Sequence, residues 1–190
     1  MKVKKIIVAQ TAASGAIYTR QILELLLSSP HVEQIAFMRS RHSRAVATHE
    51  GESLDELLES NEERIIEYAQ DDMFAPVASG SARYDAMIVA PCSVGTLSRI
   101  ATGVSDSLIT RAADVCLKER RPLVVMLRET PLSLIHLRNM VTLSEAGAIV
   151  MPASPSFYMG EASKEELCLT LSRRAVAMVG VDVDLPEWGS

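Results

Sequence analysis

The sequence predicts an α/β fold in which a parallel sheet is covered by helices on both faces. Two patterns carry this prediction: short continuous apolar runs, typical of buried parallel strands, and amphipathic stretches with helical spacing between them. The two patterns alternate along the chain, and this order is that of a layered sheet with crossover helices. The chain has 190 residues, of which 48% are hydrophobic, so it can bury a sizeable core without disulfides or metal.

Each predicted element follows from one of these patterns. Apolar runs predict strands at residues 3–9, 34–38, 86–90, 123–127 and 148–151, and amphipathic spacing predicts helices at 16–27, 105–117, 132–146 and 164–179. Segment 50–80 differs, because eight acidic residues precede an apolar stretch, and we expect one or two solvated helices followed by a loop. No linker or repeat divides the chain, so residues 1–190 form one predicted domain with a C-terminal tail at 181–190.

Charge and cysteine content exclude several classes of protein. The chain has 24 Asp and Glu against 19 Lys and Arg, a net charge of −5 that argues against binding nucleic acid or an anionic membrane surface. Its three cysteines are widely spaced, so we expect no disulfide framework, no zinc site and a reducing, cytoplasmic location. No apolar run is long enough for a membrane helix, and no histidine has metal-ligand spacing.

Small and hydroxyl-bearing residues follow the first predicted strand. Residues 11–16, Thr-Ala-Ala-Ser-Gly-Ala, enter a helix, where free N–H groups and the helix dipole can hold a phosphate or a flavin. Taken alone, these residues favour a simple tight turn with Ser14 as the N-cap. The segment lacks G-x-G-x-x-G and a P-loop lysine, which disfavours a dinucleotide or triphosphate site.

A second loop of this kind follows the strand at 86–90. Residues 91–98 place the hydroxyls of Ser93, Thr96 and Ser98 at another helix entrance, and two such loops can converge on one anion. Cys92 lies in the same loop. We interpret it as a buried, inert thiol rather than a nucleophile.

Charged residues end the strand at 123–127. Arg128 and Glu129 lie at the carboxyl end of a buried strand, where parallel sheets bind ligands. An arginine there can donate two hydrogen bonds to phosphate oxygens, and a glutamate can accept a proton. A structural ion pair is the alternative. Tyr158 and Arg174 can each reach the same opening. The alternative for Tyr158 is a loop aromatic that packs on the core, and the alternative for Arg174 is a place on a solvated helix face.

These motifs together closely resemble the UbiX-type flavin prenyltransferase family, within the wider group of homo-oligomeric flavoproteins. The segments that carry the resemblance are 11–16, 75–81, 91–98, 111–115, 117–124, 128–132, 135–140 and 157–158. The resemblance implies a three-layer Rossmann or flavodoxin-like sandwich, assembled as trimers into a dodecamer with the flavin site at subunit interfaces. It also implies transfer of a dimethylallyl group from dimethylallyl monophosphate to N5 and C6 of reduced FMN, without metal. The prenylated FMN is used by UbiD-type decarboxylases.

The resemblance also assigns site residues by matching position. FMN is assigned to Ala12, Ala13, Ser14, Ser40, Ser93, Val94, Gly95, Thr96 and Arg128. The allylic phosphate is assigned to Arg111, Lys118, Tyr158 and Arg174. Catalytic roles fall to Ser14, Glu50 and Glu129, with Ser14 near flavin N5 and the two glutamates in acid–base work.

The sequence departs from the family pattern at two positions. Ala12 stands where the family usually has glycine, and Met73 where some relatives have tryptophan, although the one tryptophan of the chain, Trp188, keeps another such position. Two other functions stay open at this point. One is an FMN-dependent decarboxylase of a cysteine-derived substrate, because residues 91–96 resemble a segment of those relatives, although their Pro-x-Met-Asn motif is missing. The other is a non-catalytic flavin carrier subunit of a decarboxylase.

Overall fold

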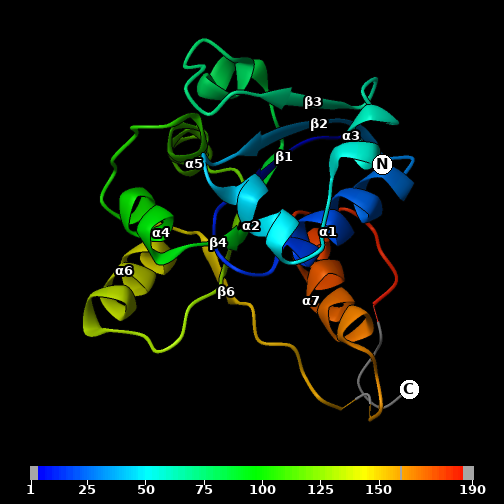
Figure 1. Ribbon diagram of the computed structural model, residues 1–190. Coiled ribbons are helices and arrows are strands. Elements are labelled where there is room, and N and C mark those ends of the chain that lie inside the picture. The colour runs from blue at the N-terminus through cyan, green and yellow to red at the C-terminus, as the bar shows by residue number, and fades with distance from the viewer. Residues whose placement is uncertain (1–3, 159, 186–190) are drawn as a thin grey trace.

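A six-stranded, fully parallel sheet forms the centre of the molecule (Figure 1), in a computed structural model that describes residues 4–158 and 160–185. The order across the sheet is β3-β2-β1-β4-β5-β6, and every neighbouring pair is parallel. The strands are β1 (Lys4–Gln10), β2 (Val32–Arg39), β3 (Ile65–Tyr68), β4 (Ala86–Cys92), β5 (Leu123–Leu127) and β6 (Ile149–Pro152). Strand order therefore reverses between β1 and β4, the position where open α/β sheets bind ligands.

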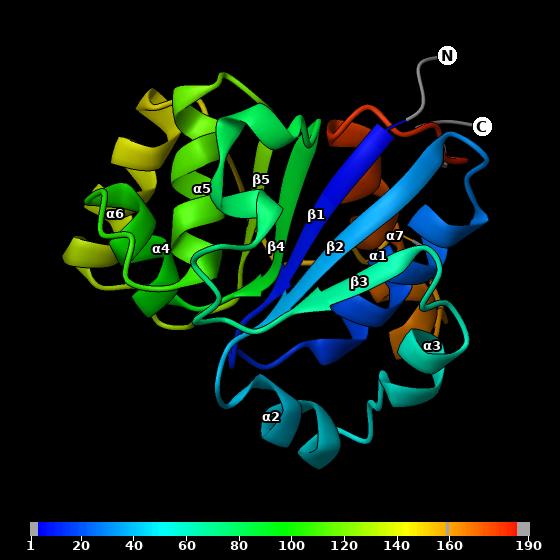
Figure 2. The ribbon, with the colours of Figure 1, turned by 90° about the horizontal axis from the view of Figure 1, so that it is seen from above.

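Helices cover both faces of the sheet, as the sequence predicted. Helices α1 and α7 pack against each other on one face, and α4, α5 and α6 lie on the other (Figure 2). The helices are α1 (Ala16–Ser28), α2 (Ser43–His49), α3 (Asp55–Glu59), α4 (Val94–Ala101), α5 (Leu108–Lys118), α6 (Leu134–Glu145) and α7 (Lys164–Met178). Two 3-10 turns, Pro76–Ala78 and Gly80–Ala82, precede β4. This arrangement confirms the predicted three-layer α/β sandwich.

Strand β1 shows why the apolar runs are continuous. Successive side chains of a strand point to opposite faces. Ile6 and Val8 accordingly join the core cluster under α1 and α7, whereas Ile7 and Ala9 join the cluster under α4 and α5. Since both faces are covered, every one of these positions must be apolar.

The sequence-based prediction was wrong for part of segment 50–80. Helix α3 is present, but the loop expected after it contains the edge strand β3, which pairs with β2. This strand is only four residues long and has Glu67 on its exposed side, so it lacks the apolar run of the other strands. Glu67 pairs instead with Arg39 of β2, at 2.6 Å between Oε1 and Nε. Helix α2 was also not predicted.

The C-terminal segment packs more closely than a tail. Val181 is 3% exposed and belongs to the core, and Val183 packs against it. Residues 186–190 of the predicted tail, which include Trp188, lie outside the described residues. In the described ranges, none of the helices combines the length and the hydropathy needed to span a bilayer.

Candidate functional site

Hydrogen bonds connect four neighbouring loops at the carboxyl edge of the sheet. The N–H of Ser40, after β2, donates to the Gln10 carbonyl of β1 at 2.9 Å. The N–H of Ser93, after β4, donates to Thr11 Oγ1 at 2.9 Å, and the N–H of Arg128, after β5, donates to the Cys92 carbonyl at 3.0 Å. The convergence of the two small-residue loops, expected from the parallel sheet, is therefore confirmed.

Glu50 caps the helix that follows the first loop. Its Oε2 accepts hydrogen bonds from the N–H groups of Gly15 at 3.0 Å and Ala16 at 2.8 Å, and the Ser14 side chain bonds the same carboxylate. Partial burial disfavours the charge. The bonds from Ser14, Ala16 and Gly15 and the nearby Arg128 guanidinium outweigh burial and lower the pKa of Glu50 below its ordinary value. Ser14 is thus not the N-cap, which is Gly15 without a side-chain bond.

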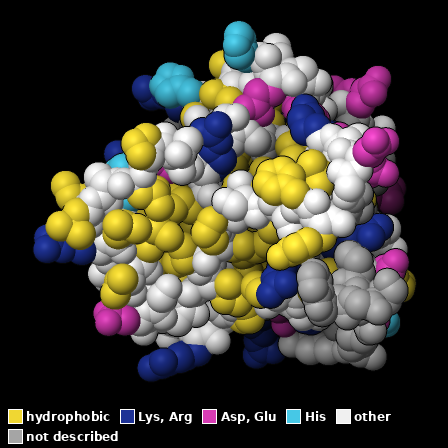
Figure 3. All heavy atoms as spheres, turned by 90° about the horizontal axis from the view of Figure 1, so that it is seen from below, with side chains coloured by type: hydrophobic (Ala, Val, Ile, Leu, Met, Phe, Trp, Pro, Cys, Tyr) yellow, Lys and Arg dark blue, Asp and Glu magenta, His cyan; other side chains and the backbone are white. Residues whose placement is uncertain are grey.

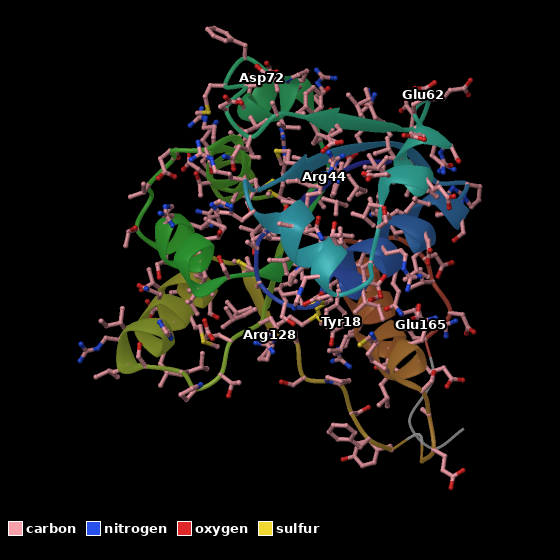
Figure 4. The ribbon with its side chains drawn as sticks, viewed as in Figure 1. Tyr18, Arg44, Glu62, Asp72, Arg128 and Glu165 are labelled. Carbon is pink, nitrogen blue, oxygen red and sulfur yellow. The ribbon has the colours of Figure 1, made fainter. Side chains whose placement is uncertain are left out.

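A cavity of about 350 Å³ opens beside this carboxylate; we call it the Ser14 cavity. It brings together three predicted site residues, Ser14, Glu50 and Arg128, with Tyr18 and Lys164. Figure 4 shows Tyr18 and Arg128 close to each other at the end of the molecule where α7 begins. The complete lining is Ser14, Gly15, Ile17, Tyr18, Glu50, Glu52, Arg128, Ala153, Lys164 and Cys168.

A second cavity of about 360 Å³, the Ser40 cavity, lies between the loops after β2 and β3, helix α4 and the start of α5. It contains two more predicted residues, Ser40 and Thr96. Its lining is rich in hydroxyls and cations: Ser40, Arg41, His42, Gln70, Thr96, Arg99, Asp106, Ser107, Ile109 and Thr110. Such a donor set suits phosphate and sugar hydroxyl groups.

The turn between β1 and α1 requires glycine at one position only. Gly15 has φ 111°, and a Cβ there would lie 3.0 Å from the Tyr18 ring. The described non-glycine residues with positive φ are Arg83 and Arg120, so Ala12 has a backbone conformation that alanine adopts without strain. The alanine at this position is therefore compatible with the loop.

These loops fit a flavin mononucleotide. The two cavities flank the row of loops at the strand-order switch, one with the Arg128 guanidinium and one with hydroxyls and basic side chains. At the end of β1, the buried Oε1 of Gln10 lacks a hydrogen-bond partner among the described residues. The predicted FMN residues lie on these loops or in the first turn of α4: Ala12, Ala13, Ser14, Ser40, Ser93 and Arg128 on the loops, and Val94, Gly95 and Thr96 in α4. Their contacts with FMN stay a prediction.

The predicted phosphate residues do not meet in one chain. Lys118 ends α5 at the edge where the strands begin, and all five residues of β5 separate that edge from Arg128. Arg174 is ten residues beyond Lys164 on α7, a rise of about 15 Å. Arg111 bonds the Ala78 carbonyl and Asp114, and Tyr158 lies on the exposed loop before α7. The common role that the resemblance assigns to them stays a prediction, and in one chain they do not surround a single site.

Glu129 and Cys92 occupy contrasting environments. The Glu129 side chain is exposed next to Arg128, and its Oε1 accepts the N–H of Thr130 at 3.1 Å. Cys92 is fully buried, and burial raises the pKa of its thiol, as expected for an inert cysteine. Among the described residues, there is no group of three or more His, Cys, Asp or Glu side chains that could hold a metal ion.

Four residues of the Ser14 cavity with polar or ionisable side chains were not predicted from the sequence. Tyr18 and Cys168 come from facing positions of α1 and α7; burial and a hydrogen bond with Cys168 raise the pKa of the Tyr18 hydroxyl. Glu52 and Lys164 complete the wall. Tyr18 belongs to the first turn of α1, directly after the loop of small residues, which is a usable signal. Nothing in the sequence indicated the other three.

Comparisons with known proteins place this site in a class. The profile of the family described as Flavoprotein matches residues 1–169, so the fold and the loops are those of a flavoprotein. The flavin prenyltransferase UbiX of Pseudomonas aeruginosa is 41% identical over 199 aligned positions, covering 98% of this chain and 94% of that protein. The chain therefore belongs to the UbiX flavin prenyltransferase family.

Solved structures agree with this assignment. A crystal structure of AnUbiX in complex with FMN and dimethylallyl pyrophosphate has a TM-score of 0.91 and 39% identity, covering 100% of this chain and 99% of the other. A dodecameric FMN-dependent UbiX-like decarboxylase from Escherichia coli has a TM-score of 0.90 and 34% identity, covering 98% and 100%. The peptidyl-cysteine decarboxylase EpiD, at 20% identity and a TM-score of 0.56, covering 81% and 88%, shows a shared fold alone.

Proposed function

We propose that this chain is a flavin prenyltransferase that joins the dimethylallyl group of dimethylallyl monophosphate to N5 and C6 of reduced FMN. The observation that carries the proposal is the grouping of Ser14, Glu50 and Arg128 around one cavity at the strand-order switch. Full-length identity with UbiX enzymes supports it. The product is prenylated FMN, and we propose a UbiD-type decarboxylase as its acceptor and the cytoplasm as its location.

Arg128 suits the first demand of this reaction. Breaking an allylic C–O bond leaves a phosphate whose charge must be neutralised. Among the described residues no carboxylate forms a salt bridge with Arg128, so its guanidinium can present two N–H groups to phosphate oxygens. Reduced FMN supplies the electron-rich N5 and C6 atoms that take up the dimethylallyl group.

Two carboxylates suit the second demand, removal of protons from the flavin. Glu50 is held as an anion by the α1 amides and bonds Ser14, so the Ser14 hydroxyl can pass a proton toward it. Glu129 directly follows Arg128, and its side chain is exposed at the carboxyl end of β5. We assign the C6 proton to Glu129 and the N5 side to the Ser14–Glu50 pair. Bond formation at N5 releases one proton as the allylic C–O bond breaks and phosphate leaves, whereas bond formation at C6 consumes the allylic double bond, so one proton is added to the alkene carbon as C6 loses its own.

A complete donor site calls for a second subunit. Lys118 and Arg174 lie too far from Arg128 to act with it in one chain, so we propose that a neighbouring copy supplies part of the phosphate site, within a homo-oligomer that is a dodecamer. Helix α6 has an apolar exposed face suited to such contacts, and hydrophobic side chains gather on that side of the molecule (Figure 3). Its most exposed members are Leu134, Ile135, Leu137 and Val141.

The test is anaerobic incubation with reduced FMN and dimethylallyl monophosphate, followed by mass and absorbance analysis of the extracted flavin. We expect a mass gain of one prenyl unit, and loss of this product in Glu129→Gln. Glu62→Gln, at the opposite end of the molecule from Arg128 (Figure 4), is the matched control and should leave the yield unchanged. Bound FMN recovered unmodified with both the monophosphate and the diphosphate donor would overturn the proposal.

A further inference from the structure

One arginine of α1 binds three carboxylates from three parts of the fold. Arg20 Nε lies 2.8 Å from Glu52 Oε2, in the segment after α2. Its Nη1 pairs with Glu24 of the same helix at 3.2 Å, and its Nη2 pairs with Glu165 in the first turn of α7. Burial alone would lower the pKa of Arg20, but the hydrogen bonds that it donates to Glu52, Glu165 and Glu24 raise that pKa, so the guanidinium stays charged.

Two of these partners belong to the wall of the Ser14 cavity or adjoin it. Glu52 lines the cavity, and its side chain is only 11% exposed. Glu165 follows Lys164, another lining residue, and its carbonyl accepts Gln21 Nε2 at 2.9 Å. Arg20 is not among the lining residues. It therefore lies behind the wall and connects α1, the segment after α2 and α7.

The position of Arg20 matters because carboxylates line the Ser14 cavity. Two carboxylates, Glu50 and Glu52, face an opening that has to admit a phosphorylated substrate. The Glu50 carboxylate accepts hydrogen bonds from the α1 amides and from Ser14. The Glu52 carboxylate instead forms a salt bridge with Arg20. In a partly buried site, an unpaired carboxylate repels an anion with little screening by salt.

We propose that Arg20 is a positioning residue that neutralises Glu52 and so permits the phosphorylated donor to bind next to Arg128. The inference rests on the proposed function for the identity of that donor. It requires that loss of Arg20 weakens phosphate binding through Glu52, and that the prenyl transfer step itself is little affected. Arg20 touches neither FMN nor the donor in this proposal.

The experiment compares the full-length protein with Arg20→Met, which keeps much of the apolar stem, and with Arg20→Met/Glu52→Gln. Calorimetric binding of inorganic phosphate and the KM and kcat of prenyl transfer are measured for each. We expect Arg20→Met to weaken phosphate binding and raise the donor KM on the order of tenfold, with kcat nearly unchanged. The double variant should recover most of the loss. Glu24→Gln, which removes only the pair within α1, is the matched control and should behave as wild type.

The outcomes separate this inference from the proposed function. Equal phosphate affinity in wild type and Arg20→Met, or no phosphate binding by the wild type, overturns the inference whether or not prenyl transfer occurs. A loss that Glu52→Gln does not recover shows a purely structural role and overturns it too. Thermal melting of each variant verifies folding. Wild type that binds phosphate but transfers no prenyl group contradicts the proposed function alone.

Discussion

The Glu50 carboxylate lies on the first turn of α1, where its Oε2 accepts the N–H of Ala16 at 2.8 Å. The two residues are 34 positions apart in the chain. One side chain thereby caps a helix, holds the Ser14 hydroxyl and contributes negative charge to the Ser14 cavity. The same carboxylate therefore affects both the stability of the fold and the charge of the cavity, and its effect on stability can be measured.

Replacement of Glu50 should give a pH-dependent loss of stability. The folded state lowers the pKa of Glu50, so its charge stabilises the fold above the ordinary value of 4.5, and the contribution disappears as pH falls through the lowered pKa. Glu50→Gln should cost about 1 kcal/mol at neutral pH and almost nothing in acid. Urea unfolding at several pH values measures this, with exposed Glu33→Gln as control. A pH-independent difference would contradict the prediction.

A methyl group at Gly15 should cost more than one at Gly51. Both glycines have positive φ, but a Cβ at Gly15 meets the Tyr18 ring at 3.0 Å, whereas a Cβ at Gly51 has nothing within 4 Å. We expect a loss of about 1 kcal/mol for Gly51→Ala and about 2 kcal/mol or more for Gly15→Ala. Denaturant unfolding compares the pair. Equal losses would show that Tyr18 moves aside freely.

Two inactive variants should restore activity when mixed within one oligomer. Lys118→Met and Arg128→Met each remove a residue that we assign to a different copy at the shared site. If they are co-expressed and assemble at random, roughly a quarter of the sites receive both native residues. Prenyl transfer by the mixed protein measures the recovery, and each variant alone is the control. Activity no higher than that of either variant would place both residues in one copy's site.

A charge on the exposed face of α6 should disrupt assembly. Ile135 is 69% exposed, and burying a lysine at its position against a second copy is costly. Ile135→Lys should therefore lower the molar mass in solution, measured by light scattering after size exclusion, with unchanged far-UV circular dichroism. Glu62→Lys, in the acidic segment before β3, serves as control. An unaltered oligomer would exclude this face as an interface.

The core of the fold was accessible from sequence because its signals are local. Strand β5 was predicted to the residue, and α1 and α7 to within one residue at each end. Continuous apolar runs and helical spacing depend only on which neighbours a residue has along the chain. Strand β3 was not predicted because a short edge strand needs few apolar residues. Its Glu67 forms a salt bridge with Arg39 of the adjacent strand.

The sequence by itself determined the α/β class and the loops at which parallel strands end, and its resemblance to UbiX enzymes predicted a set of functional residues. The tertiary structure alone decided which of those residues meet. It brought Glu50 to the helix after Ser14, placed Arg20 behind Glu52 and Glu165, and held Lys118 at the opposite edge from Arg128. The physical reason is that contacts between distant segments follow from the packing of whole helices on the sheet, and this packing leaves no periodic trace in the chain.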